Sequence, residues 1–91
     1  MADMTQISRD YRIKLDKAVT AFSLFIHALC PDAQLEVSFV RYENEDAHIW
    51  VTLPPTLSET EREDCANRMA EKSLDILLTE DLLILAGVEN P

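Results

Sequence analysis

Two histidines and two cysteines are the side chains of this 91-residue sequence best suited to chemistry. His27 and Cys30 lie three residues apart, and His48 and Cys65 follow further along the chain. Two imidazoles and two thiolates make up one common ligand set of a tetrahedral zinc site. The spacing matches none of the usual zinc motifs, and Pro31 restricts the backbone directly after Cys30. A metal- or small-molecule-binding protein that uses these side chains is therefore an alternative hypothesis, and we predict no metal site.

No pattern in the sequence is typical of catalysis or of cofactor binding. A Cys–His nucleophile needs a neighbour that lowers the thiol pKa and a third residue that orients the histidine, and the sequence around the cysteines offers neither. Gly87 is the only glycine, so no glycine-rich loop can hold a phosphate. The acidic stretch from Glu43 to Asp46 lacks the register of a calcium loop and is expected to be a solvated turn. We expect no catalytic residue and no cofactor.

Net charge limits the classes of partner. Seventeen acidic residues against eight lysines and arginines give a net charge of -9. A nucleic-acid backbone or an anionic membrane would repel such a chain, so we expect neither as a partner. Residues 31–91 hold four basic and fourteen acidic residues. An acidic adaptor that docks on a basic protein is therefore a second alternative, although the same charge can simply keep the protein soluble.

Length and composition predict one domain over residues 1–91. A hydrophobic fraction of 47% and a charged fraction of 27% are typical of a folded chain. No apolar run approaches the roughly 20 residues that span a bilayer, and the N-terminus does not resemble a secretion signal. We therefore expect a cytoplasmic protein with reduced thiols.

Apolar periodicity predicts two helices. In the first, apolar residues recur at steps of mostly three and four from Ile7 to Leu29, and Pro31 ends the helix. The second begins at a capping box formed by Ser58 and Glu61. Its predicted buried face consists of Cys65, Ala66, Met69, Ala70, Ser73, Leu74 and Leu77.

Alternating side chains predict two strands between these helices. Positions 35, 37 and 39 share one face of the first strand, and positions 49, 51 and 53 share one face of the second. We expect these odd-numbered residues to face the helices. Pairing Phe39 with Val51 and Val37 with Leu53 keeps all of them on the same face and leaves residues 44–46 as a tight turn.

The tail is compatible with two structures. Residues 82–88 form either a short buried strand or a short helix that ends at Gly87. We predict the strand, because a third strand completes a sheet that two helices can cover. The predicted fold is α+β with the order α-β-β-α-β, an antiparallel hairpin with two helices packed on one face.

The predicted register leaves an unusually aromatic layer on the other face of the hairpin. Val40 is expected to lie opposite Trp50, and Tyr42 opposite His48. A solvated face normally carries more charge and fewer large rings. We therefore predict a non-catalytic protein-interaction module, a homodimer whose contact surface centres on Val40, Tyr42, His48 and Trp50.

Overall fold

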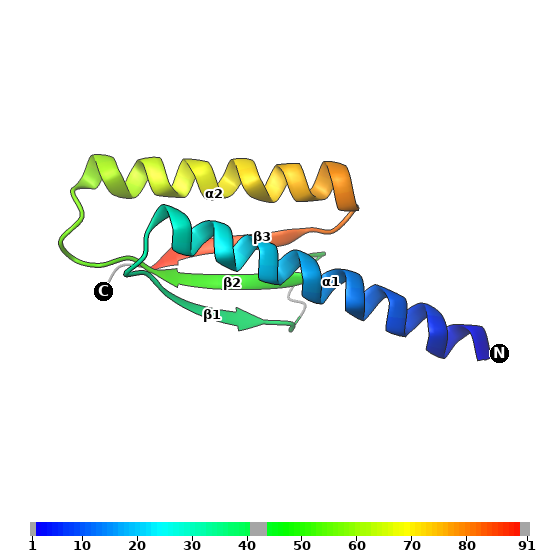
Figure 1. Ribbon diagram of the computed structural model, residues 1–91. Coiled ribbons are helices and arrows are strands. Elements are labelled where there is room, and N and C mark those ends of the chain that lie inside the picture. Colours follow the sequence, from blue (N-terminus) through cyan, green and yellow to red (C-terminus); the bar gives the residue numbers. More distant parts are fainter. Residues whose placement is uncertain (1, 41–43, 90–91) are drawn as a thin grey trace.

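The computed structural model describes the backbone of residues 2–40 and 44–89, and the side chains of residues 9–40 and 44–89. Its elements in chain order are α1 (Ala2–Leu29), β1 (Gln34–Ser38), β2 (Ala47–Thr52), α2 (Glu59–Glu80) and β3 (Ile84–Glu89) (Figure 1). Three strands in one sheet, with two helices, confirm the predicted α+β class and element order. The tail is a strand, so the helical alternative for residues 82–88 is wrong.

α1 is much longer than the sheet that it covers. Its 28 residues span about 42 Å, whereas the six residues of β2 span about 20 Å. Leu15 is the first side chain of α1 that the structure describes as buried, Tyr11 packs against the core one turn earlier, and the N-terminal end of α1 extends beyond the sheet (Figure 1). The helix ends where Pro31 requires, and the Cys30 amide still donates a 2.8 Å hydrogen bond to the Ile26 carbonyl.

β2 is the central strand of a mixed sheet. β1 pairs with it antiparallel and β3 pairs with it parallel. The parallel pairing follows from the connection, because α2 carries the chain back to the end of the sheet where β2 begins. β1 and β3 are therefore the two edges of the sheet.

The observed register of the hairpin differs from the predicted one. Val37 pairs with Ile49, not with Leu53, and Leu35 pairs with Val51. The shift is an even number of residues, so Leu35 and Val37 stay on the same face as Ile49 and Val51. Val37 is nevertheless 37% exposed, and Phe39 lies beyond the end of β1 and is 45% exposed, so the predicted inward layer is wrong for these two residues. The tight turn at residues 44–46 is also wrong, because β1 ends at Ser38 and β2 begins only at Ala47.

Asp46 explains why that turn does not form. Its carboxylate accepts a hydrogen bond from the Tyr11 hydroxyl of α1 and a second, 2.8 Å long, from the Leu83 amide. Its own amide donates to the Leu83 carbonyl at 2.7 Å. Asp46 therefore joins α1, the start of β2 and the approach to β3. The expectation of a solvated acidic turn is wrong for this residue and also for Glu45, which is only 4% exposed.

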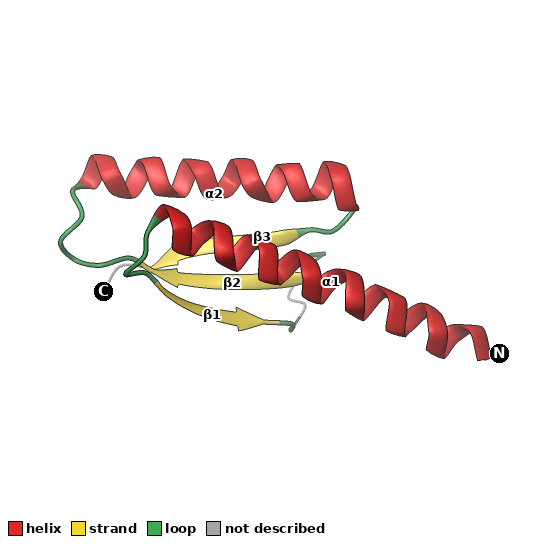
Figure 2. Cartoon of the chain, in the orientation of Figure 1, coloured by secondary structure: helices red, strands yellow, loops and turns green. Residues whose placement is uncertain are grey.

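The core lies between the sheet and the helices, which share one side of it (Figure 2). Ala47, Ile49, Val51 and Leu53 are fully buried on that side, which confirms the predicted inward face of β2.

The capping box is also confirmed: the Ser58 hydroxyl accepts from the Glu61 amide, and the Glu61 carboxylate accepts from the Ser58 amide.

The buried face of α2 is narrower than predicted. Cys65, Met69 and Ile76 are its buried residues, whereas Leu74 is 55% exposed and Leu77 is 36% exposed. The helix packs chiefly against β3 at the edge of the sheet, so a side chain that points past this edge has nothing beneath it. The prediction that Ala70, Leu74 and Leu77 are buried is therefore wrong.

Candidate functional site

The outer face is the side of the sheet opposite the helices. Strand pairing places on it Gln34, Glu36, Ser38, His48, Trp50, Thr52, Leu85, Gly87 and Glu89. Among the described residues, neither helix covers this face (Figure 2). It therefore combines aromatic and apolar groups at its centre with polar groups around them, outside the hydrophobic core.

A stacked aromatic pair occupies the centre of the outer face. The rings of His48 and Trp50 lie 3.9 Å apart between centroids, with 18° between their planes. Gly87, next to Trp50 on β3, leaves the necessary space. A Cβ atom at position 87 would lie 2.9 Å from the His48 Nε2 and 3.2 Å from the nearest Trp50 ring carbon. The stack therefore depends on the absence of a side chain at this position.

The His48 ring is close to a buried carboxylate but is not hydrogen-bonded to it. Neither of its buried ring nitrogens has a hydrogen-bond partner among the described residues. The Oε2 of the buried Glu45 lies 3.9 Å from Nδ1, which is within ion-pair distance but beyond hydrogen-bond distance. A buried polar group without a partner costs about 1–3 kcal/mol. The described residues therefore hold this ring by stacking on Trp50 and by its position beside Glu45, and not by hydrogen bonds.

The structure brings together only part of the predicted contact surface. His48 and Trp50 lie on the outer face as predicted, but their neighbours on β1 are Ser38 and Glu36, so the predicted pairing of Val40 with Trp50 is wrong. Val40 lies beyond the end of β1, is 60% exposed, and donates its amide to the Ser38 hydroxyl at 3.2 Å. Tyr42 lies outside the described residues.

Leu85 is the apolar neighbour that sequence reasoning missed. It lies beside His48 on β3 and is 37% exposed. Its alternation with the inward-facing Ile84 and Ala86 is visible in the sequence, but the direction and register of β3 are not. Leu85 replaces Val40 as the aliphatic residue next to the stack.

The two histidines and two cysteines do not form a common site. Cys30 and Cys65 are buried free thiols that line one cavity of about 410 Å³. His27 is exposed on α1, and His48 lies on the outer face. Within the part of the chain that the structure describes, no group of three or more histidine, cysteine or acidic side chains is placed to hold a metal ion.

Burial, and next the neighbouring Cys30, raise the pKa of the Cys65 thiol above its ordinary value. A thiol with a raised pKa is a poor nucleophile at neutral pH, because only the thiolate attacks. Cys65 therefore behaves as a small apolar residue of the interior.

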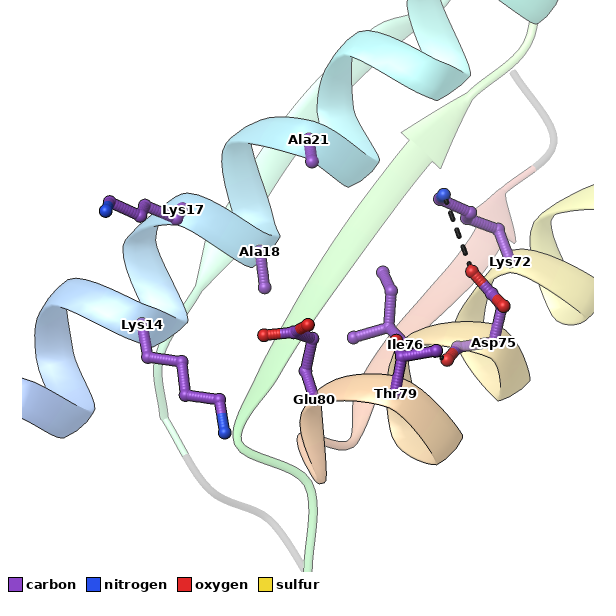
Figure 3. Close-up of a pocket in the computed structure, with 9 residues that line it drawn as sticks. All are labelled: Lys14, Lys17, Ala18, Ala21, Lys72, Asp75, Ile76, Thr79 and Glu80. Atoms are coloured by element: carbon purple, nitrogen blue, oxygen red, sulfur yellow. Dashed lines mark hydrogen bonds and ion pairs between the residues drawn. The ribbon is translucent and has the colours of Figure 1, made fainter.

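A second cavity separates the two helices (Figure 3). Its volume is about 270 Å³, and Ala18, Ala21 and Ile76 contribute apolar groups to its walls. The remaining lining residues are Lys14, Lys17, Lys72, Asp75, Thr79 and Glu80, which include every lysine of the chain. Lys72 pairs with Asp75 at 3.7 Å. Positively charged ammonium groups and negatively charged carboxylates both line this cavity. Its charge therefore favours neither an anionic nor a cationic ligand. In the sequence, only the three-residue spacing of Lys14 and Lys17 hints at this cluster.

Neither α1 nor α2, over the residues that the structure describes, is apolar enough to span a lipid bilayer. Comparisons with protein-family models, with curated proteins and with solved structures found no significant match. Function must therefore be inferred from the surfaces of the chain itself.

Proposed function

We propose that this chain is a non-catalytic protein-interaction module that forms a homodimer through the outer face. The observation that carries this proposal is the His48–Trp50 stack on the uncovered side of the central strand. Tryptophan is among the residues that most often dominate the binding energy of protein interfaces. A structural role for the stack is less favourable, since the buried His48 nitrogens lack partners among the described residues.

The composition of the outer face resembles that of an interface. Trp50 and Leu85 lie at or near its centre, and the carboxylates Glu36 and Glu89 lie on the strands to either side. Interfaces typically combine an aromatic centre with a polar rim that remains in contact with water. A second copy is the simplest partner, because two-fold dimers are the commonest assemblies and a domain of 91 residues buries comparatively little surface alone.

A basic protein is the alternative partner, favoured by the excess of acidic residues after residue 30. The two partners respond differently to salt. Binding to a basic protein should weaken steeply as ionic strength rises, because exposed charges are screened beyond about 10 Å at 0.1 M salt. A dimer centred on aromatic rings should respond little.

The molecular mass in solution tests the proposal. We expect Trp50→Ala to reduce the mass of the native assembly by half at equal concentration. Leu24→Ala is the matched control, because Leu24 is 65% exposed on α1, away from the outer face, and this variant should keep the native mass. A native chain that is monomeric, or a Trp50→Ala variant with the native mass, contradicts the proposal.

A further inference from the structure

The only two cysteines of the chain belong to different helices but share one cavity. Cys30 directly follows the last residue of α1, and Cys65 lies in the second turn of α2. The C-terminal end of α1 and the N-terminal end of α2 lie at the same end of the molecule (Figure 1). There both cysteines line the cavity of about 410 Å³. The fold thus brings together two thiols that are far apart in the sequence.

The effect of Cys30 on the pKa of Cys65 supports their proximity. Burial is the largest cause of the raised Cys65 pKa, and Cys30 is the second, ahead of Asp64, the residue next to Cys65 in the sequence. An electrostatic interaction weakens with distance, so an effect larger than that of an adjacent residue indicates two thiols close together. Both thiols are free. They are therefore a pair, and not two unrelated interior side chains.

The cavity gives a small reagent access to this pair. Cys30 and Cys65 are only 5% and 7% exposed. Thr60, Glu61 and Asp64, which line the same cavity, are all exposed, so the cavity opens to solvent. Because the chain carries a net charge of -9, a cationic reagent approaches it more readily than an anionic one.

We propose that Cys30 and Cys65 form a reversible disulfide, so that oxidation joins the end of α1 to α2 and reduction releases it. The co-reactant is a small-molecule disulfide. Disulfides that form in reducing surroundings are usually transient and redox-sensing. In the reduced chain both thiols pack as apolar groups of the interior, and in the oxidised chain they fasten the two helices together.

The bridge forms by two thiol–disulfide exchanges. Cys30 loses its proton and its thiolate attacks one sulfur of the reagent, whose S–S bond breaks. A mixed disulfide forms on Cys30 and one thiol leaves. Cys65 then loses its proton, and its thiolate attacks the Cys30 sulfur and releases the second thiol. The two cysteines together lose two electrons and two protons, and the reagent is reduced to two thiols.

The raised pKa of Cys65 suits it to the second exchange. A thiol with a raised pKa is a slow nucleophile toward a dilute reagent, because little of it is thiolate. The second attack occurs within one chain, where proximity compensates for the small thiolate fraction. The bridge should therefore form faster as pH rises toward about 9, the ordinary thiol pKa.

The bridge closes a loop that contains both β1 and β2. A crosslink stabilises a fold chiefly by restricting the unfolded chain, and the effect grows with the length of the loop. Oxidation should therefore make the hairpin, and with it the outer face, more resistant to unfolding. The redox state of the thiol pair thus sets the stability of the sheet.

Reaction of the reduced native chain with cystamine, a small cationic disulfide, tests the inference. We expect the intact mass to fall by two hydrogen atoms and a protease digest to contain Cys30 linked to Cys65. The urea midpoint should rise on oxidation, and dithiothreitol should restore the original mass and midpoint. A folded chain that keeps both thiols free, or that adds a cysteamine group to each cysteine without a bridge, overturns the inference.

Cys65→Ala is the matched variant, because alanine keeps this position small and apolar. It should gain one cysteamine group on Cys30 and stop there, since the second thiol is absent. Its urea midpoint should not rise on treatment. Far-ultraviolet circular dichroism checks that the variant is folded. A midpoint that rises as much in Cys65→Ala as in the native chain shows that the bridge is not the cause, and overturns the inference.

The result is independent of the proposed function. The cysteines lie with the helices, on the opposite side of the sheet from the outer face (Figure 2). A bridge within one chain leaves the mass of the native assembly unchanged, and Trp50→Ala should still form it. A bridge between two chains, which doubles the mass of the denatured chain in the absence of reductant, overturns this inference and leaves the outer-face proposal to its own test.

Discussion

The inner and outer faces of β2 differ although they alternate residue by residue along one strand. Ile49 and Val51 are fully buried beneath the helices, whereas His48 and Trp50 stack on the side that neither helix covers. The inner residues are explained by the core that they fill. The outer pair is not explained in this way, because aromatic burial there is incomplete and the His48 nitrogens lack partners among the described residues. The residues of the inner face are thus explained by their contribution to stability. The residues of the outer face indicate a second role, such as binding.

The largest expected effect comes from the inner face. Ile49→Ala removes a fully buried side chain and leaves a cavity, so the free energy of unfolding should fall by about 2–5 kcal/mol. Urea unfolding measures the change. Thr52→Ala, on the outer side of the same strand, is the control and should change stability by less than about 0.5 kcal/mol. Equal losses of unfolding free energy in Ile49→Ala and Thr52→Ala would contradict the distinction between a stabilising inner face and an outer face that contributes little to stability.

A smaller loss is expected where a single polar side chain anchors the inner layer. Asp46 accepts hydrogen bonds from both the Tyr11 hydroxyl and the Leu83 amide. Asp46→Asn keeps one acceptor oxygen, so one of these donors loses its partner. The free energy of unfolding should therefore fall by about 1.5–3 kcal/mol. Tyr11→Phe removes only the hydroxyl and should cost about 1 kcal/mol. If Asp46→Asn costs less than Tyr11→Phe, the assignment of Asp46 as the anchor is wrong.

On the outer face, Gly87→Ala should disturb the stack more than the stability. The added Cβ would lie 2.9 Å from the His48 Nε2, so the His48 and Trp50 rings must move. We expect a loss of about 1 kcal/mol, at the lower end of what overpacking costs, together with a clear change in the near-ultraviolet circular dichroism of Trp50. Leu85→Ala, a truncation on the same strand and face, should leave that signal largely unchanged. An unaltered spectrum for Gly87→Ala contradicts the described packing.

The smallest effect concerns the pH dependence of stability. Because burial raises the pKa of Cys65, the folded chain binds more protons than the unfolded chain between the ordinary thiol pKa of about 9 and the higher folded value. The free energy of unfolding should therefore fall as pH rises above about 9. Urea titrations across this range measure the slope, and Cys65→Ala should have a shallower one. A slope that is identical in Cys65→Ala would show that Cys65 does not contribute.

Much of the fold could be predicted because it is specified by local pattern. The helix end before Pro31, the Ser58–Glu61 capping box and the inward side of β2 each depend on nearby residues, and each is confirmed. The register of β1 on β2 could not be predicted, since a shift by four residues preserves the alternation of faces. The bonds of Asp46 to residues 35 and 37 positions away have no local signal at all.

The candidate site shows the same division. Parity alone placed His48 and Trp50 on one face. Their neighbours depend on the register of β1 and on the parallel pairing of β3, so Val40 was wrongly paired and Leu85 was missed. The exposed positions of Leu74 and Leu77 depend likewise on where α2 rests on the sheet, which periodicity does not determine.

The fluorescence of Trp50, the only tryptophan of the chain, tests most directly whether the outer face binds a second copy. Dilution from high to low concentration should shift its emission maximum to longer wavelength as the indole becomes hydrated, while far-ultraviolet circular dichroism stays constant. An emission maximum that does not depend on concentration, in a chain whose mass shows that it does assemble and dissociate over that range, would contradict the account.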